Sequence, residues 1–292
     1  VTRIRELAYA YPGENLHVAD LPYRLCAPSA QDAENVRLFE DGSAQLLAFG
    51  IVQAAWGTLD YFIRPAARDH GIEDALMTWA VERFQRLTDA RSRDLDWWID
   101  TRADVPDRAA LAARYGCTDA GWGLMHLRRP LDVPFSEPRV PDGFTSRPLA
   151  GVADAAACAA LQRAAFASAN MTTAWRLRTL AMPEYLPELD LVTVAPDGRH
   201  AAFCLCWLHS ATHEAQVEPI AVHPDFQRLG LGHALLYEVF HRMRSLHATS
   251  ASVESSSTRA PALALYTSAG CREAHTSGKY ARSFQPAEPA PA

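Results

Sequence analysis

The feature that most constrains this fold is a long internal repeat. Twice along the chain, an apolar segment, an Asp-Gly turn and a second apolar segment precede a strand that ends at a proline and then an amphipathic helix. Two apolar segments joined by an Asp-Gly turn predict a β-hairpin. The first copy uses residues 36–52, 59–65 and 72–87, and the second uses residues 191–207, 217–224 and 231–246. We therefore expect an α/β chain, with a mixed α+β sheet, built from two copies of one unit.

The ends of the two copies support the repeat and show that they differ in length. Each copy closes on a related segment, residues 111–117 in the first and residues 263–271 in the second. The second hairpin is preceded by residues 144–149, an Ala-rich helix over residues 152–167 and a further segment over residues 173–180. The first copy has only about 35 residues before its hairpin, so we expect it to lack an opening strand or helix.

A proline-rich stretch separates the two copies. Prolines deny backbone donors and favour extended chain, which is typical of a linker. We predict an N-terminal domain over residues 1–130, a linker over 131–142, a C-terminal domain over 143–284 and a disordered tail over 285–292.

Composition excludes several function classes. With 49% hydrophobic and 21% charged residues the chain is an ordinary globular one, and no apolar run reaches the roughly 18 residues that span a bilayer. The start lacks the apolar region of a signal peptide, so we expect a cytoplasmic protein without a membrane partner. A net charge of −6 argues against nucleic-acid binding. The preference for arginine over lysine and the abundant alanine suggest a bacterial coding bias. The six cysteines form no CxxC pair, so we expect neither disulfides nor zinc.

The motif that points to chemistry is the loop from Gln227 to Gly232, between a strand ending at Pro224 and an amphipathic helix. The first amides of a helix lack partners and favour an anion, and glycines let a phosphate approach the backbone. This arrangement predicts a diphosphate cradle. A dinucleotide fingerprint would need a third glycine where Leu235 stands, so a Rossmann site loses support.

This loop, the strand over residues 217–222 and the later segment 262–271 resemble the GNAT acetyltransferase superfamily. The family pattern is Q/R-x-x-G-x-G/A, followed some 35 residues later by A-x-x-L-Y-x-x-x-G-F. The resemblance covers residues 147–282 strongly and the first half loosely, which implies two tandem GNAT-fold domains. Cys271 replaces the usual phenylalanine and Arg259 a common asparagine, and both departures loosen any assignment to a subfamily.

The resemblance implies a site for acetyl-CoA, the co-substrate. The loop amides of residues 229–233 would hold the pyrophosphate, and the strand edge would bind the pantetheine arm. A backbone N–H near Val222 would stabilise the developing oxyanion. The implied cofactor-binding residues are Ile220, Ala221, Val222, Gln227, Arg228, Leu229, Gly230, Leu231, Gly232 and His233.

The corresponding loop of the first copy is degenerate. Glu73 stands where the second glycine would be, and Asp69 and Asp74 lie close by in the sequence. A carboxylate at such a cradle repels a diphosphate. We therefore expect the N-terminal domain to bind no CoA and to serve as scaffold, or as a wall of the acceptor pocket.

Two residues are candidates for the chemistry of acyl transfer, which needs a deprotonated amine and a protonated leaving thiolate. The resemblance implies Glu218 as general base. Its location in an apolar strand favours a raised pKa and action as a base through water. The alternative role for Glu218 is to recognise a cationic acceptor without taking part in catalysis. Pro219 beside it fits the bulge or splay of this strand in the family. The resemblance implies Tyr266 as general acid, and the alternative role for Tyr266 is a core aromatic.

Other reactive side chains have simpler interpretations. His223 is expected to be a loop histidine, Cys204 and Cys206 to be core residues, and Trp97 and Trp98 to pack in the core of the first copy. The residues His209, His213 and Glu214 could suggest a metal, but they read as a turn between strands. We expect no metal.

The function we predict is N-acetyl transfer from acetyl-CoA to a primary amine of a small molecule, by direct attack in a ternary complex. The tandem arrangement and length are also similar to mycothiol synthase, so a small metabolite acceptor is an alternative, as is an antibiotic. An alternative of another class is a non-catalytic acyl-CoA-binding scaffold. The sequence leaves the oligomeric state open.

Overall fold

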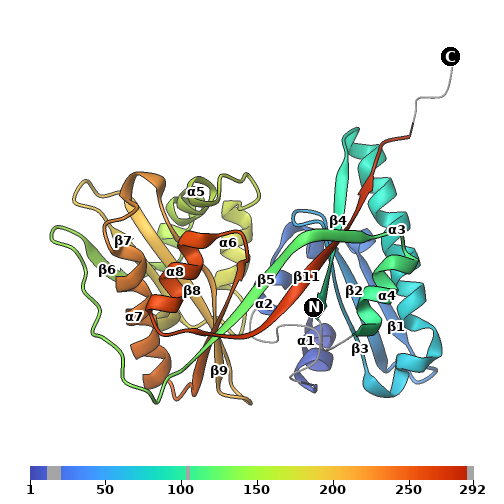
Figure 1. Ribbon diagram of the computed structural model, residues 1–292, viewed down its shortest axis with the longest axis horizontal. Coiled ribbons are helices and arrows are strands. Elements are labelled where there is room, and N and C mark those ends of the chain that lie inside the picture. Colours follow the sequence, from blue (N-terminus) through green and yellow to red (C-terminus); the bar gives the residue numbers. More distant parts are fainter. Residues whose placement is uncertain (12–20, 103–105, 288–292) are drawn as a thin grey trace. The chain divides into compact units, whose positions relative to one another are not determined.

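The computed structural model describes residues 1–11, 21–102 and 106–287. The chain divides into two compact units (Figure 1). Unit 1 contains residues 1–124 and the chain from Thr276 onward, and unit 2 contains residues 125–275. The predicted boundaries differ from this division, because the C-terminal strand belongs largely to unit 1.

Unit 1 has the strand order β1-β2-β3-β4-β11. Strands β1 to β3 form an antiparallel meander, as the first repeat predicts, and β4 pairs antiparallel with β11. The elements are α1 (Thr2–Tyr9), α2 (Leu21–Leu25), β1 (Val36–Glu40), β2 (Leu46–Gln53), β3 (Thr58–Ile63), α3 (Ile72–Arg91), β4 (Leu95–Arg102), α4 (Pro106–Arg114), β5 (Thr118–Pro130) and β11 (Arg272–Phe284), the last two of which also extend into unit 2.

Unit 2 has the strand order β5-β10-β9-β8-β7-β6. Its elements are β6 (Thr145–Pro148), α5 (Ala155–Phe166), α6 (Thr173–Leu180), β7 (Asp190–Val194), β8 (His200–His209), β9 (Glu214–Val222), α7 (Leu231–Ser245), β10 (Ser250–Ser256) and α8 (Ala260–Ser268). The β7–β8 hairpin confirms the second predicted Asp-Gly turn. Within residues 1–11 and 21–35, which precede β1, the structure contains helices and no counterpart of β6.

The core of unit 2 lies on both faces of its sheet. Helix α7 presents Leu231, Leu235, Val239 and Met243 at i, i+4 spacing, and all four are buried with Val217 of β9 and Tyr266 of α8. On the opposite face α5 packs on β7 and β8 through a second cluster that includes Phe203. Strand β8 is therefore covered on both faces, which explains its nearly continuous apolar sequence.

Unit 1 repeats part of this arrangement. Helices α3 and α4 share one core with β2, β3 and β4, and Trp97 is fully buried in it. The linker predicted over 131–142 contains no helix or strand, although Leu131 is fully buried in unit 2. The predicted tail starts at residue 285, whereas Gln285 and Ala287 still hydrogen-bond with α3, and residues 288–292 lie outside the described chain.

Candidate active site

The predicted cradle begins where β9 ends. His223 caps a short 3-10 turn, Pro224–Phe226, by accepting a hydrogen bond from the backbone N–H of Asp225 at 3.2 Å, which supports its interpretation as a loop histidine. Gly230 is the N-cap of α7 and has a φ of 86°. The first helical hydrogen bond runs from the N–H of Ala234 to the carbonyl of Gly230 at 3.0 Å.

Because that bond is the first, the backbone N–H groups of Leu231, Gly232 and His233 have no carbonyl partner within the helix. They face outward from its N-terminal end. The first turn carries no acidic side chain. The N-terminus of α7 is therefore free of negative charge and suited to an anion.

The side chains of the loop leave this end of the helix accessible. Gln227, Arg228 and Leu229 are exposed. A Cβ on Gly230 would meet nothing within 4 Å, so this glycine leaves open space beside the amides. A Cβ on Gly232 would lie 3.2 Å from Leu265, which shows how closely α7 approaches α8. The His233 ring lies 2.7 Å from the hydroxyl of Ser268 in α8.

Strand β9 has an open edge next to the cradle. Its parallel pairing with β10 covers three residue pairs and ends at Gln216 and Ser252, although both strands continue. On the other side β9 pairs with β8 as far as Val222, and the N–H of His223 bonds to the carbonyl of Ala201. Hydrogen bonding alternates along such a strand, so the backbone groups of Ile220 and Val222 point away from β8, toward the side where β10 no longer pairs.

Glu218 and Pro219 form a bulge within β9. The register with β8 shifts between Cys204 and Cys206, and the Glu218–Pro219 peptide bond is cis. This confirms the irregularity expected at Pro219. The indole N–H of Trp207 donates to the carbonyl of Glu218 at 3.1 Å. Val217 packs under α7, so the half-buried Glu218 that follows it points to the opposite face of the sheet.

Tyr266 lies on the α7 face and is 6% exposed. Burial raises the pKa of its hydroxyl, and the negative charge of Glu218 raises it further. The hydroxyl therefore stays protonated and can donate a proton. Its burial in the core also fits the structural role expected as the alternative, and the catalytic roles of Glu218 and Tyr266 stay predictions.

In the first copy, the first turn of the equivalent helix, α3, carries two carboxylates, Glu73 and Asp74. Gly71 caps α3 with a φ of 72°, as Gly230 does for α7. The hydroxyl of Tyr61 donates to Glu73 at 2.7 Å, and that of Tyr115 donates to Asp74 at 2.8 Å. These two carboxylates occupy the first turn of α3 and leave no free positive end there for a diphosphate.

The counterpart of Tyr266 in unit 1 is an alanine. The N–H of Cys271 bonds to the carbonyl of Tyr266 at 3.0 Å, and the N–H of Cys117 bonds to that of Ala112 at the same distance. Ala112 thus stands where unit 2 has its tyrosine, and unit 1 has no hydroxyl at this position.

Most of the remaining candidates are buried in the cores. The thiols of Cys204 and Cys206 lie 3.5 Å apart, fully buried beneath α7, as expected for core residues. Trp97 is buried, whereas Trp98 is half-buried and lies against Trp122. His213 lies in the turn between β8 and β9. No group of three or more potential metal-ligating side chains occurs within residues 1–11, 21–102 and 106–287.

Three polar residues near the bulge were not singled out from the sequence: Gln216 on β9, Glu254 on β10 and His126 on β5. They are spread over 129 residues and match no motif, so only the pairing of the strands brings them to one face.

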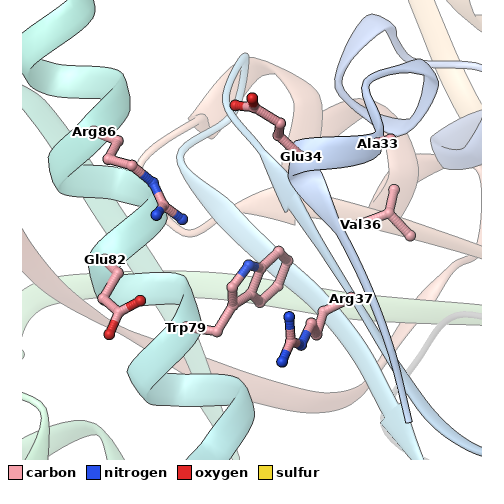
Figure 2. Close-up of a pocket in the computed structure, with 7 residues that line it drawn as sticks. All are labelled: Ala33, Glu34, Val36, Arg37, Trp79, Glu82 and Arg86. Carbon is pink, nitrogen blue, oxygen red and sulfur yellow. The ribbon is translucent and has the colours of Figure 1, made fainter. Parts of the chain in front are cut away.

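Unit 1 also contains an open hollow of about 420 Å³ between α3 and the segment that leads into β1 (Figure 2). Its lining combines the indole of Trp79 with two arginines, Arg37 and Arg86, and two glutamates, Glu34 and Glu82. None of the predicted site residues lines it.

A protein-family model and several related proteins match this chain. The model of the Acetyltransferase (GNAT) family matches residues 157–271. A mycothiol acetyltransferase from Kineococcus radiotolerans is 34% identical over 67% of this chain and 62% of its own length. A mycothiol acetyltransferase from Clavibacter michiganensis subsp. michiganensis is 32% identical over 84% of this chain and 82% of its own.

A solved structure shows the same fold. A tandem GNAT protein from the clavulanic acid biosynthesis pathway has a TM-score of 0.66 at 15% identity, and the match covers 98% of this chain and 95% of that one. None of the described helices is long and apolar enough to cross a bilayer. The chain is a tandem-domain member of the GNAT acetyltransferase superfamily.

Proposed function

We propose that unit 2 transfers an acetyl group from acetyl-CoA to a primary amine of a small molecule. One observation carries the proposal. The accessible N-terminus of α7 lies next to the unpaired edge of β9, with only the short loop from His223 to Gly230 between them. An anion site and an open strand edge in this order suit a ligand with a diphosphate and an amide-containing arm.

The residues of this region fit acetyl-CoA. The amides of Leu231, Gly232 and His233 would hold the pyrophosphate at the open space beside Gly230, with the exposed Arg228 as a nearby cation. The outward-facing backbone of Ile220 and Val222 would pair with the pantetheine arm, as an added strand pairs with an open edge. Acetyl-CoA supplies an acetyl group activated as a thioester.

The acid and base candidates suit direct transfer because they lie on opposite faces of the sheet. Tyr266 is on the α7 face and can protonate a leaving thiolate. Glu218 points to the other face and can take the proton of the amine. The Val222 N–H points toward the unpaired edge between them, where it can donate to the thioester oxygen.

The names of the relatives support a small-molecule acceptor, because both of the sequence relatives described above are mycothiol acetyltransferases. In unit 1 the carboxylates of Glu73 and Asp74 argue against a second acetyl-CoA site. One site per chain is the expected stoichiometry.

Calorimetric titration of acetyl-CoA into the full chain tests the donor site. We expect micromolar binding at one site, abolished in Gly230→Glu because a carboxylate would fill the open space at the start of α7. Gly71→Glu is the matched control, since Gly71 also caps a helix at positive φ with nothing within 4 Å of its Cβ position. It carries the same backbone strain and should leave binding unchanged.

The outcomes separate the alternatives. Equal loss of binding in both variants would show a general folding defect and remove the support for this cradle. Binding of acetyl-CoA without transfer to any amine in a broad screen would favour the non-catalytic acyl-CoA-binding protein.

A further inference from the structure

A row of polar side chains lies on the face of the unit 2 sheet opposite α7. Ser250 pairs with Glu214 and Ser252 with Gln216, and the residues that alternate with them along the two strands belong to the core under α7: Ala215, Val217, Ala251 and Val253. Because side chains alternate along a strand, the row continues with Glu254 on β10 and with Glu218 on β9.

Glu218 and Glu254 lie on either side of the point where the strands stop pairing. Each is two residues beyond the last pair, Gln216 with Ser252, and neighbouring strands are only about 5 Å apart where they pair. The two carboxylates therefore flank the unpaired edge of β9 on the face that Glu218 shares.

Glu254 is held in place from the next strand. The Nδ1 atom of His126 lies 3.2 Å from a carboxylate oxygen of Glu254, and the two side chains are only 12% and 13% exposed. The ring of His126 stacks on that of His275, with the centroids 4.1 Å apart and an angle of 18° between the planes. A carboxylate fixed this way is a preorganised recognition group.

Gln216 is a second, independent sign of a ligand at this face. Its side chain is 1% exposed, and its amide oxygen has no hydrogen-bond partner among the residues that the structure describes. A buried acceptor without a donor is costly, and a ligand N–H would satisfy it.

We infer that Glu254 and Gln216, together with Glu218, form the recognition site for the ammonium group of the acceptor. An alkylammonium ion has three N–H donors, as a lysine side chain does, and this face offers three acceptors: two carboxylates and one amide oxygen. The class of acceptor is therefore a primary amine that arrives protonated. Glu254 recognises the cation, and Glu218 then takes its proton. This inference rests on the proposed function, because it assumes that the acceptor reaches the Glu218 face.

The test uses a small cation and its neutral isostere, n-propylamine and n-propanol, titrated at pH 7 and low salt into the full chain with CoA bound, because CoA carries no acetyl group and leaves the amine unreacted. The readout is the NMR signal of the Trp207 indole N–H, which bonds to the carbonyl of Glu218. We expect the amine to bind at least tenfold more tightly than the alcohol. Glu254→Gln, which keeps the shape and removes the charge, should reduce that preference about tenfold.

Glu214→Gln is the matched control. Glu214 belongs to the same polar row but lies at the paired end of β9, where Arg128 already neutralises it. It should leave the preference unchanged within twofold. No preference for the amine in the unaltered chain, or an undiminished preference in Glu254→Gln, would overturn the assignment.

Acetyl-CoA affinity keeps the two proposals apart. If the unaltered chain binds no acetyl-CoA, the proposed function fails. If acetyl-CoA binds equally to the unaltered chain and to Glu254→Gln, and only the amine preference departs from expectation, the cation site alone is wrong.

Discussion

At the scale of single residues, the proposed chemistry depends most on Tyr266. Its hydroxyl is buried on the α7 face, and burial together with the charge of Glu218 raises its pKa above the usual value of 10.0. A raised pKa keeps the proton on the phenol, which is the form that a general acid needs. The family motif could predict this residue, because the tyrosine lies four residues before the glycine that ends its helix.

Tyr266→Phe removes only the hydroxyl, so we expect kcat to fall by roughly 100-fold while the affinity for acetyl-CoA stays within twofold. Steady-state kinetics and calorimetry measure the two effects. Tyr237→Phe on α7 is a control that should leave kcat unchanged. An unchanged kcat in Tyr266→Phe would remove the acid role.

The pH dependence follows from the direction of the same shift. The protonated form of Tyr266 persists as the pH rises through 10, because the folded protein holds the pKa above that value. The pH profile of kcat should therefore show no alkaline loss below about pH 10. An alkaline limb near pH 8 that disappears in Tyr266→Phe would contradict the raised pKa.

Glu254 shows the limit of reading single residues. It belongs to a serine-rich segment, and no spacing connects it with His126, 128 positions earlier. The pairing of β9 with β10 and the contact with β5 give it a place near Glu218.

At the scale of elements, a buried ion pair joins α6 to β7. Arg176 on the helix contacts both carboxylate oxygens of Asp190 at the start of the strand, and neither side chain is exposed. Tyr185 also donates to Asp190 at 2.8 Å. Removing one partner from such a pair leaves an uncompensated buried charge.

Asp190→Asn should therefore lower the free energy of unfolding by about 3–5 kcal/mol. Asp197→Asn is the matched control, because Asp197 pairs with Arg199 on the surface, where half of each side chain is exposed. That change should cost less than about 1 kcal/mol. Urea unfolding followed by circular dichroism measures both changes. Equal losses in the free energy of unfolding would show that the buried Asp190 pair stabilises the fold no more than the exposed Asp197 pair does.

Elements with one clear period could be predicted from the sequence, and those without one could not. The hairpins and helices α3 and α7 follow apolar spacing and Asp-Gly turns. Strands β5 and β11 have mixed polarity, with Gly121 and Gly123 in one and Gly278 in the other, so no alternation marks them.

At the scale of the whole molecule, the two halves exchange their last strands. The second part of β5 belongs to unit 2 and the second part of β11 to unit 1. In unit 2, Arg129 of β5 bonds to the carbonyl of Ala269 at 2.9 Å, after α8. In unit 1, Arg282 of β11 bonds in the same way to the carbonyl of Tyr115 at 2.8 Å, after α4.

This exchange predicts how fragments behave. A fragment of residues 143–275 starts at the predicted domain boundary and ends with unit 2, but it lacks Leu127 and Leu131, which are buried in the core under α7. It also leaves β10 with an unpaired edge. We expect it to aggregate or to unfold without cooperativity.

The fragment 125–275, which is the whole of unit 2, restores the missing strand and is the control. It should be soluble and unfold cooperatively in a thermal scan followed by circular dichroism. Equally cooperative unfolding of the shorter fragment would show that β5 is not needed for unit 2.

The sequence by itself determined the repeat and the family and predicted the cradle at the start of α7, because hydrophobic period, turn residues and glycine spacing act over short distances along the chain. It also predicted that the first copy has no such cradle, since Glu73 stands inside the motif. Tertiary structure alone decided the exchange of β5 and β11 and the meeting of Gln216, Glu218 and Glu254 on one face. These features depend on which strands pair and in what register. Strand pairing brings together residues that are far apart in the sequence, so no short sequence pattern predicts them.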